Sequence, residues 1–459
     1  MQNTGIIRTD FLAAIRPFVY ASKLIGLMPL DSPDRCSGEI SSKKVYIGTS
    51  PWNIAHSLIL ILGLLCAFVP HLKFKITHIH TCYSFSFVIF DVVGCVLLFL
   101  ASLVSLLQQA ILCREELKDS LLTIARIDSH LLRNSYSGVY RKTKIILVLQ
   151  LVISFVYFLT LFSFDFFTTK KSFGWFHRFV KYFINAIDVV MSLQFVNFVF
   201  MIGHRFRVLN SELNSTVTAS SIRVHDYTSY PDGADSVSFI EVGFDDTVGR
   251  KKMATRVVPA ASTTNTQIFT NHWLKRRLRN QGVCNIRTLR RIYLLLHSVI
   301  STVNNSFGVQ IMLTIISSAT ATTLNIHTVI VFLTKDLGTS VKDNMNKLLM
   351  LNLASTIPGV LKLIIITASC ELSKKEAGRT AVLVHKLLLH RNVDPDILTE
   401  LQLFSQQLLH INTNFTASGF FVLDFSFLYS TLGSIATFLV FLTQVWESYG
   451  HHTHTQACD

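Results

Sequence analysis

The stretch "SFSFVIFDVVGCVLLFLASLVSLLQQAIL", Ser84 to Leu112, decides the fold class because Asp91 is its only charged residue. A helix crosses the hydrocarbon core of a bilayer with roughly 20 predominantly apolar residues. Backbone polar groups in that core must be satisfied within the segment, which a helix does. The stretch therefore predicts a transmembrane helix.

Six further apolar runs of similar length accompany it along the chain. The composition agrees with lipid as the solvent, because 15% of the residues are charged and 50% are hydrophobic, whereas soluble proteins carry about a quarter charged residues. We therefore expect an all-α membrane protein with seven transmembrane helices. Residues 1–50 lack the apolar core and cleavage site of a secretory signal, so we expect the first run to be retained as a span. The six runs are Asn53–Pro70, Ile145–Thr168, Tyr182–Ile202, Val309–Leu333, Lys347–Ser369 and Thr416–Val445.

The distribution of lysine and arginine predicts the orientation of these helices, since short cytoplasmic segments tend to hold the excess. Four alternate segments carry 32 of these residues and the intervening ones carry nine. We therefore expect a cytoplasmic N-terminus and an extracellular C-terminus. The four cytoplasmic segments are 1–52, 113–144, 203–308 and 370–415.

The long segment between the fourth and fifth spans, residues 205–280, is predicted to be largely disordered. His225 to Asp246 has six acidic residues and no lysine or arginine, a composition typical of disorder. Order is expected again from Ile286, where apolar residues recur at helical spacing and run into the fifth span. Asp394-Pro395 predicts the start of a second cytoplasmic helix over 398–412.

Several sequence features are compatible with functions of other protein classes. The net charge of +14 and "WLKRRLR" at 273–279 are accounted for by juxtamembrane contact with anionic lipid, so we expect no nucleic-acid partner. We find no HExxH, GxSxG, GxxxxGK or GxGxxG motif, so we expect no enzyme and no cofactor. His451, His452 and His454 are interpreted as solvated rather than as a metal site. A disulfide between Cys82 and Cys458 stays open.

Polar side chains inside the spans predict a ligand site, since intramembrane ionisable residues are costly and usually functional. Asp188 lies one or two turns inside the outer face. Apolar walls with a few hydrogen-bonding groups are typical of small-molecule sites, although helix-packing contacts are an alternative. For Lys362 we expect snorkelling or local pairing, and for Asp165 an interfacial position. The expected neighbours of Asp188 are Tyr157, Phe162, Thr323, Asn325, His327, Asn352 and Ser355.

The C-terminal run "TFLVFLTQV", Thr437 to Val445, resembles the hallmark of the insect gustatory receptor family: T-Y, five mostly apolar residues, then Q-F. Phe438 and Val445 depart from it, which leaves the threonine, the spacing and Gln444. Three further stretches are similar to the family: "RPFVYASKLIGLMPL" at 16–30, "VNNSFGVQ" at 303–310 and "INTNFTASGFFVLD" at 411–424. The resemblance covers the chain outside the 205–280 segment.

The resemblance implies a tastant-gated cation channel, similar in fold to insect odorant receptors and built as a homotetramer or as a heterotetramer with related subunits. It implies that residues 416–446 line a shared pore and that Phe441, Gln444 and Val445 form the gate. It also implies a tastant site in the extracellular half of the other six spans, with Tyr157, Asp188, Thr323, Asn325, Asn352 and Ser355. The expected partners are a small-molecule tastant, permeating cations and membrane lipid, at the plasma membrane of sensory neurons. Ligand-driven movement of the fifth and sixth helices would then shift the gate.

Two other classes of membrane protein are alternatives. A secondary transporter should show two similar halves with broken helices at matched positions, and no such repeat is visible in the sequence. A G-protein-coupled receptor needs an extracellular N-terminus, against the charge distribution. Leu439 stands where sugar receptors of the family often have an acidic residue, which favours a bitter or fructose-type ligand.

Overall fold

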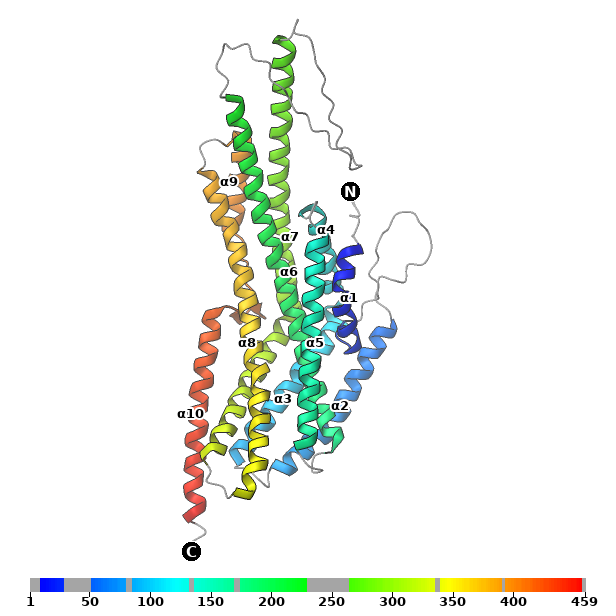
Figure 1. Cartoon of the computed structure of the whole chain (residues 1–459), viewed down its shortest axis with the longest axis vertical. Coiled ribbons are helices and arrows are strands. Elements are labelled where there is room, and N and C mark those ends of the chain that lie inside the picture. Colours follow the sequence, from blue (N-terminus) through cyan, green and yellow to red (C-terminus); the bar gives the residue numbers. More distant parts are fainter. Residues whose placement is uncertain are drawn as a thin grey trace. The chain divides into compact units, whose positions relative to one another are not determined.

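The chain folds almost entirely into helices. The computed structural model describes residues 9–28, 51–79, 85–131, 136–168, 174–228, 264–334, 339–389 and 393–455. The helices are α1 (Thr9–Leu24), α2 (Pro51–Ile79), α3 (Phe85–Leu107), the π-helical turn η2 (Gln108–Leu112), α4 (Arg114–Leu131), α5 (Tyr136–Thr168), α6 (Trp175–Thr228), α7 (Thr264–Thr334), α8 (Thr339–Leu388), α9 (Pro395–Leu409) and α10 (Phe425–Thr455) (Figure 1). The strands β1 (Thr416–Ala417) and β2 (Phe421–Val422) pair antiparallel.

Seven of the described helical segments are long and apolar enough to cross a membrane. They belong to α2, α3 with η2, α5, α6, α7, α8 and α10. The predicted all-α membrane fold with seven spans is therefore confirmed. Many large apolar side chains of these helices are exposed, as on the lipid-facing side of α5, where Phe155 is 68% exposed.

The helix ends differ from the ends of the apolar runs. Helix α2 continues through Pro70 to Ile79 and α6 begins at Trp175, so both include charged residues that the sequence analysis placed in loops. Helix α6 extends to Thr228 and α7 begins at Thr264, so helix enters the 205–280 segment from both sides. Residues 229–263 lie outside the described residues, as do Cys82 and Cys458.

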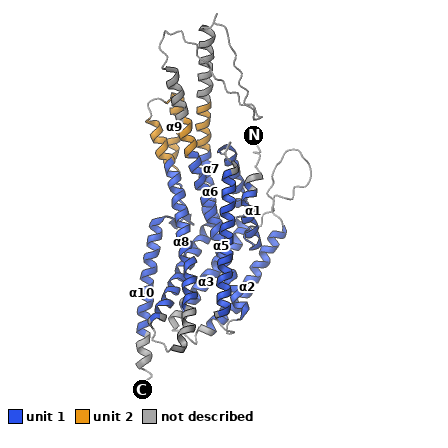
Figure 2. Cartoon of the chain, viewed as in Figure 1, with its two compact units in different colours: residues 1–209, 292–379, 412–459 blue, residues 210–291, 380–411 orange. Residues whose placement is uncertain are grey.

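Two compact units are distinguished in Figure 2. Unit 1 contains residues 1–209, 292–379 and 412–459, and unit 2 contains residues 210–291 and 380–411. In unit 2, Glu400 of α9 accepts two hydrogen bonds from Arg287 of α7. The helix predicted over 398–412 is observed as α9, whose N-cap Asp394 accepts a hydrogen bond from the backbone N–H of Asp396. An aspartate cap followed by proline favours this start, because the carboxylate accepts a hydrogen bond from a first-turn N–H and proline has no N–H that would lack a partner.

A buried ion pair ties three helices of unit 1 together. Arg205 of α6 donates two hydrogen bonds, of 2.9 and 2.6 Å, to the carboxylate of Asp128 on α4. The hydroxyl of Tyr140 on α5 donates to the same carboxylate at 2.8 Å. Because both charges are buried, this bidentate geometry and the third donor offset the cost of removing them from water.

The segment before α10 is held against α7 by a side-chain amide. Asn304 of α7 donates to the carbonyl of Asn414 at 3.0 Å and accepts from the N–H of Thr416 at 3.1 Å. The turn between β1 and β2 has positive φ at Ser418 and Gly419. A Cβ on Gly308 of α7 would lie 2.5 Å from the backbone nitrogen of Ser418, so only glycine leaves room for this turn.

Candidate ligand cavity and the exposed face of α10

A cavity of about 430 Å³ lies among the six spanning helices other than α10, within unit 1. Its lining comes from the end of the bundle at which α2 ends and α3 begins. Aromatic rings contribute to the wall, where Phe74 stacks on His177 at 3.9 Å between ring centroids. A pocket of this size is at the lower end of the range for small-molecule sites.

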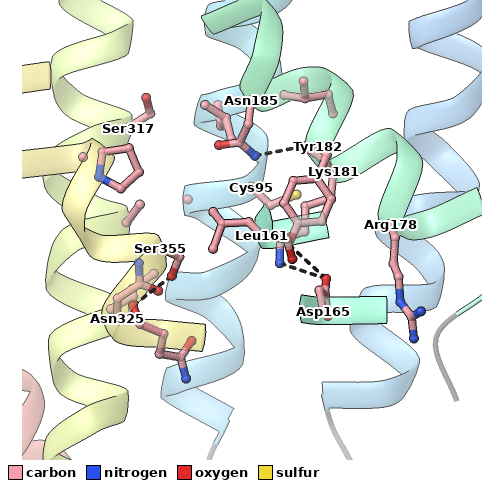
Figure 3. A pocket seen from close by; sticks show the side chains of 18 of the residues that line it. Cys95, Leu161, Asp165, Arg178, Lys181, Tyr182, Asn185, Ser317, Asn325 and Ser355 are labelled. Atoms are coloured by element: carbon pink, nitrogen blue, oxygen red, sulfur yellow. Dashed lines mark hydrogen bonds and ion pairs between the residues drawn. The ribbon is translucent and has the colours of Figure 1, made fainter. Parts of the chain in front are cut away.

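Ionisable side chains line this cavity in an unusual number for a site inside a membrane bundle. Lys75 of α2 pairs with Asp91 of α3 at 3.0 Å. Asp165 of α5 lies 3.9 Å from Lys181 of α6 and accepts a hydrogen bond from Tyr182 at 3.2 Å. Figure 3 shows Asp165, Lys181 and Tyr182 gathered on one wall. Each of these two pairs joins two different helices. The charged side chains therefore line the cavity and also stabilise the packing of the helices around it.

In the third ion pair, one member lines the cavity and the other is buried behind the lining. Lys362 of α8 lines the cavity and its ammonium contacts the carboxylate of Asp188 on α6. The second oxygen of Asp188 accepts a hydrogen bond of 2.7 Å from Thr314 on α7. Asp188 itself is 0% exposed. One carboxylate therefore connects α6, α7 and α8, with a partner on each oxygen, as a buried charge requires.

Neutral hydrogen-bonding groups fill the remaining wall formed by α7 and α8. Asn325 and Ser355 lie near one another there (Figure 3). Asn352 precedes Ser355 by one turn and also lines the cavity, as does Tyr157 of α5. Amides and hydroxyls in an otherwise apolar and aromatic wall can fix the orientation of a small polar molecule.

The structure brings together four of the six predicted ligand-site residues. Tyr157, Asn325, Asn352 and Ser355 line the cavity. Asp188 is buried behind it, and Thr323 is buried with its hydroxyl donating to the carbonyl of Ala319 in its own helix.

Of the other expected neighbours, Phe162 packs edge-on against Tyr182. His327 is buried and is likewise absent from the cavity lining. Similar positions along neighbouring helices did not determine the direction in which each side chain points.

Sequence reasoning missed several charged residues of the lining. Lys75, Arg178 and Lys181 were counted as loop charges, and Asp165 was interpreted as interfacial. A usable signal existed, because Lys75 lies five residues beyond Pro70 with no glycine or second proline between them. Proline favours a helix end only when the freed backbone group has no other partner, and transmembrane helices often continue past it.

The last helix, α10, packs against the rest of the subunit along one narrow face. Among its described side chains the buried ones are Leu428, Ile435 and Leu442, which recur every seven residues. A second stripe lies on nearly the opposite face, within an arc of about 80° at 3.6 residues per turn. It is exposed throughout and largely polar: Ser430, Ser434, Thr437, Phe441 and Gln444. Of the predicted gate residues, Phe441 and Gln444 are exposed and Val445 is half-buried.

Comparisons with known proteins agree with this architecture. A family model described as 7tm Chemosensory receptor matches residues 15–445. The chain is 36% identical over 70 residues to "Putative gustatory receptor 28b" of Drosophila melanogaster, a match that spans 15% of this chain and 15% of that relative.

Two solved structures of the insect olfactory receptor OR5 from Machilis hrabei are similar in fold. One has a TM-score of 0.50 at 13% identity and covers 94% of this chain and 97% of that chain. The other, in complex with eugenol, has a TM-score of 0.52 at 13% identity and covers 95% and 100%. At this identity the likeness concerns the fold alone.

Proposed function

Because the chain belongs to the 7tm Chemosensory receptor family, we propose that it is a subunit of a tastant-gated, non-selective cation channel in the plasma membrane of chemosensory neurons. Its ligand is a small polar molecule, such as fructose or a hydrogen-bonding plant compound. Four copies, or this chain with related subunits, surround one pore. The N-terminus is cytoplasmic, which places the cavity in the extracellular half of the bundle.

The observation that carries the proposal is the ionisable lining of the cavity. Lys75, Asp91, Asp165, Lys181 and Lys362 all line it. An apolar ligand would displace water from these groups without replacing its hydrogen bonds, which costs free energy. A ligand with several hydroxyl or amide groups can donate to the carboxylates and accept from the ammonium groups. The cavity is therefore better suited to a water-soluble tastant than to an apolar odorant.

The polar stripe of α10 supports the channel part of the proposal. A helix attached by three buried residues and carrying exposed Gln444 on the far side needs another polar surface or water there. In a tetramer, four copies of this amide form a ring that replaces part of a cation's hydration shell. Phe441, one turn away on the same stripe, can close the path by dewetting.

The ligand class is tested by expressing the full chain in cultured cells and recording calcium signals and whole-cell currents. Fructose, caffeine and eugenol serve as polar, hydrogen-bonding and largely apolar probes. We expect cation currents with a polar probe and none with eugenol. Asn352→Ala should raise the half-maximal concentration about tenfold, since it removes hydrogen bonds to the ligand. Asn197→Ala is the matched control, because Asn197 bonds Gln150 and does not line the cavity. Currents with eugenol alone would contradict the assigned ligand class.

The pore assignment is tested separately with Gln444→Ala in the same currents. We expect the permeability ratio of calcium to sodium, or the rectification, to change while the half-maximal tastant concentration stays within about twofold. Gln402→Ala on α9 is the control, because that glutamine is exposed and lies outside the seven spans. Unchanged permeation in Gln444→Ala would assign this amide to helix packing instead.

A further inference from the structure

Helix α8 contains Pro358 within its membrane-spanning segment, Leu349–Leu388. Proline has no backbone N–H, so the carbonyl four residues earlier, that of Ala354, loses its partner within the helix. The proline ring also crowds this carbonyl. In a bilayer core such a group needs a donor from elsewhere, because there is no water to satisfy it.

The replacement donor is the hydroxyl of Tyr157 on α5, which donates to the carbonyl of Ala354 at 2.7 Å. A side chain from a neighbouring helix thus completes the backbone of α8 at its break. Tyr157 was predicted to bind the ligand, whereas its hydroxyl donates to this backbone carbonyl. Its role is therefore to position α8.

The turn on the N-terminal side of the break also depends on side-chain donors. The hydroxyls of Ser355 and Thr356 both donate to the carbonyl of Asn352, at 2.9 and 2.8 Å. Such bonds from serine and threonine to the preceding turn weaken and bend helices. The backbone from Asn352 to Pro358 is therefore the part of α8 that bends most readily.

The C-terminal side of the break is held by two neighbouring helices. Gly359 lies so close to α7 that a Cβ would meet the Thr322 hydroxyl at 2.7 Å. Lys362, one turn later, contacts Asp188 of α6. A change of angle at Pro358 would therefore move the N-terminal part of α8 and leave the part beyond Gly359 in place.

The cavity contacts this break directly, since Tyr157, Ser355, Pro358, Gly359 and Lys362 all line it. We propose that α8 has a hinge at Pro358 whose angle is set by the hydrogen bond from Tyr157 to Ala354, and that an occupant of the cavity acts on the channel by changing this bond. The proposal rests on the proposed function, because it describes how the same cavity controls the current. A ligand shifts such a hinge only if it binds its two angles with different affinity.

A double-mutant cycle tests the hinge. Tyr157→Phe removes the donor and keeps the ring, and Pro358→Ala restores an N–H that bonds Ala354 within α8. In the wild-type background we expect Tyr157→Phe to change the half-maximal tastant concentration about two- to tenfold, the range for one net hydrogen bond. In the Pro358→Ala background the same substitution should change it less than about twofold, because Ala354 no longer needs Tyr157.

Tyr182→Phe is the matched control. Tyr182 lines the same cavity, but its hydroxyl serves the Asp165 carboxylate and the Leu161 carbonyl. Its effect should be equal in the two backgrounds, because neither partner is freed by a proline. Equal effects of Tyr157→Phe in both backgrounds, or no effect in either, would overturn the hinge. If Pro358→Ala does not reach the cell surface, Pro358→Leu restores the same N–H.

A readout that needs no tastant separates this proposal from the proposed function. Hydrogen exchange is measured on the full chain in lipid nanodiscs for the amides of residues 359–361, because their helical acceptors, the carbonyls of residues 355–357, lie on the other side of Pro358. Tyr157→Phe should accelerate the exchange of these amides about two- to tenfold in the wild-type background. In the Pro358→Ala background the same substitution should leave their exchange unchanged. This result would support the hinge even if no tastant evoked a current. Unchanged exchange in the wild-type background would overturn it.

Discussion

At the scale of single residues, Asp188 shows how far an intramembrane charge can be interpreted from sequence. Its depth and cost predicted a residue of the ligand site, whereas the structure buries it behind the cavity, where Lys362 and Thr314 contact its carboxylate. The identity of the partners was not predictable, because apolar runs do not report how α6 is rotated about its axis. For the same reason the sequence could not show that Tyr157 and Asn325 line the cavity while Thr323 is buried away from it.

Removing one member of this buried pair should destabilise the protein strongly. We expect Asp188→Ala to lower the free energy of unfolding by about 3–5 kcal/mol, because it leaves the Lys362 ammonium without its partner inside the membrane. Thermal unfolding of the protein in detergent, with cell-surface expression, measures the effect.

A paired replacement distinguishes charge from packing. Asp188→Leu combined with Lys362→Met should be more stable than Asp188→Ala, since no buried charge then lacks a partner. Asp91→Ala is the control, because the pair of Asp91 with Lys75 is about a quarter exposed on both sides and should cost less. A double variant less stable than Asp188→Ala would contradict this account.

At the scale of helices and strands, the apolar interiors were predictable and the ends were not. The runs identified seven spans because burial in lipid demands apolar length. They ended α2 at Pro70 and began the last helix at Thr416, whereas α2 runs to Ile79 and α10 begins at Phe425. Hydropathy cannot distinguish the strands β1 and β2 from the start of a helix, because a short apolar run is compatible with either structure. The hairpin depends instead on the distant contacts of Asn304 and Gly308.

The contact of α7 with this hairpin gives a prediction for one glycine. Gly308→Ala should displace the turn at Ser418, because the added Cβ would lie 2.5 Å from a backbone nitrogen that cannot move alone. We expect a loss of about 1–3 kcal/mol, typical of overpacking, measured as reduced thermal stability and weaker currents. Gly378→Ala on α8 is the control, since its added Cβ meets no atom within 4 Å, and it should be neutral or slightly stabilising. Equal effects at the two glycines would refute this role of Gly308.

At the scale of the whole molecule, the charge distribution predicts the orientation in the membrane. The long helices α6, α7 and α8 each contribute residues to both compact units. The positive-inside rule predicts that residues 380–411 are cytoplasmic and that the N-terminus is cytoplasmic. This orientation stays a prediction, because the fold alone is compatible with either one.

Epitope tags at the two ends of the chain test the orientation in intact cells. We expect the C-terminal tag to be stained without permeabilisation and the N-terminal tag only after it. The sequons at Asn214, Asn304 and Asn414 should then carry no glycan, since all three lie on the cytoplasmic side. Asn304 is moreover engaged with the backbone of Asn414. Surface staining of the N-terminal tag, or a mobility shift after glycosidase treatment, would reverse the orientation.

The three ion pairs around the cavity each join two different helices. This limits how the ligand preference of such a receptor can change by substitution. Replacing Asp188 alone would leave the Lys362 ammonium without its partner, so a change of ligand preference through this buried pair needs two coordinated substitutions. Asn325, Asn352 and Ser355 line the same cavity without a charge to balance. Single-step diversification of the recognised compounds should therefore proceed through the amides and hydroxyls, while the charged frame is inherited unchanged.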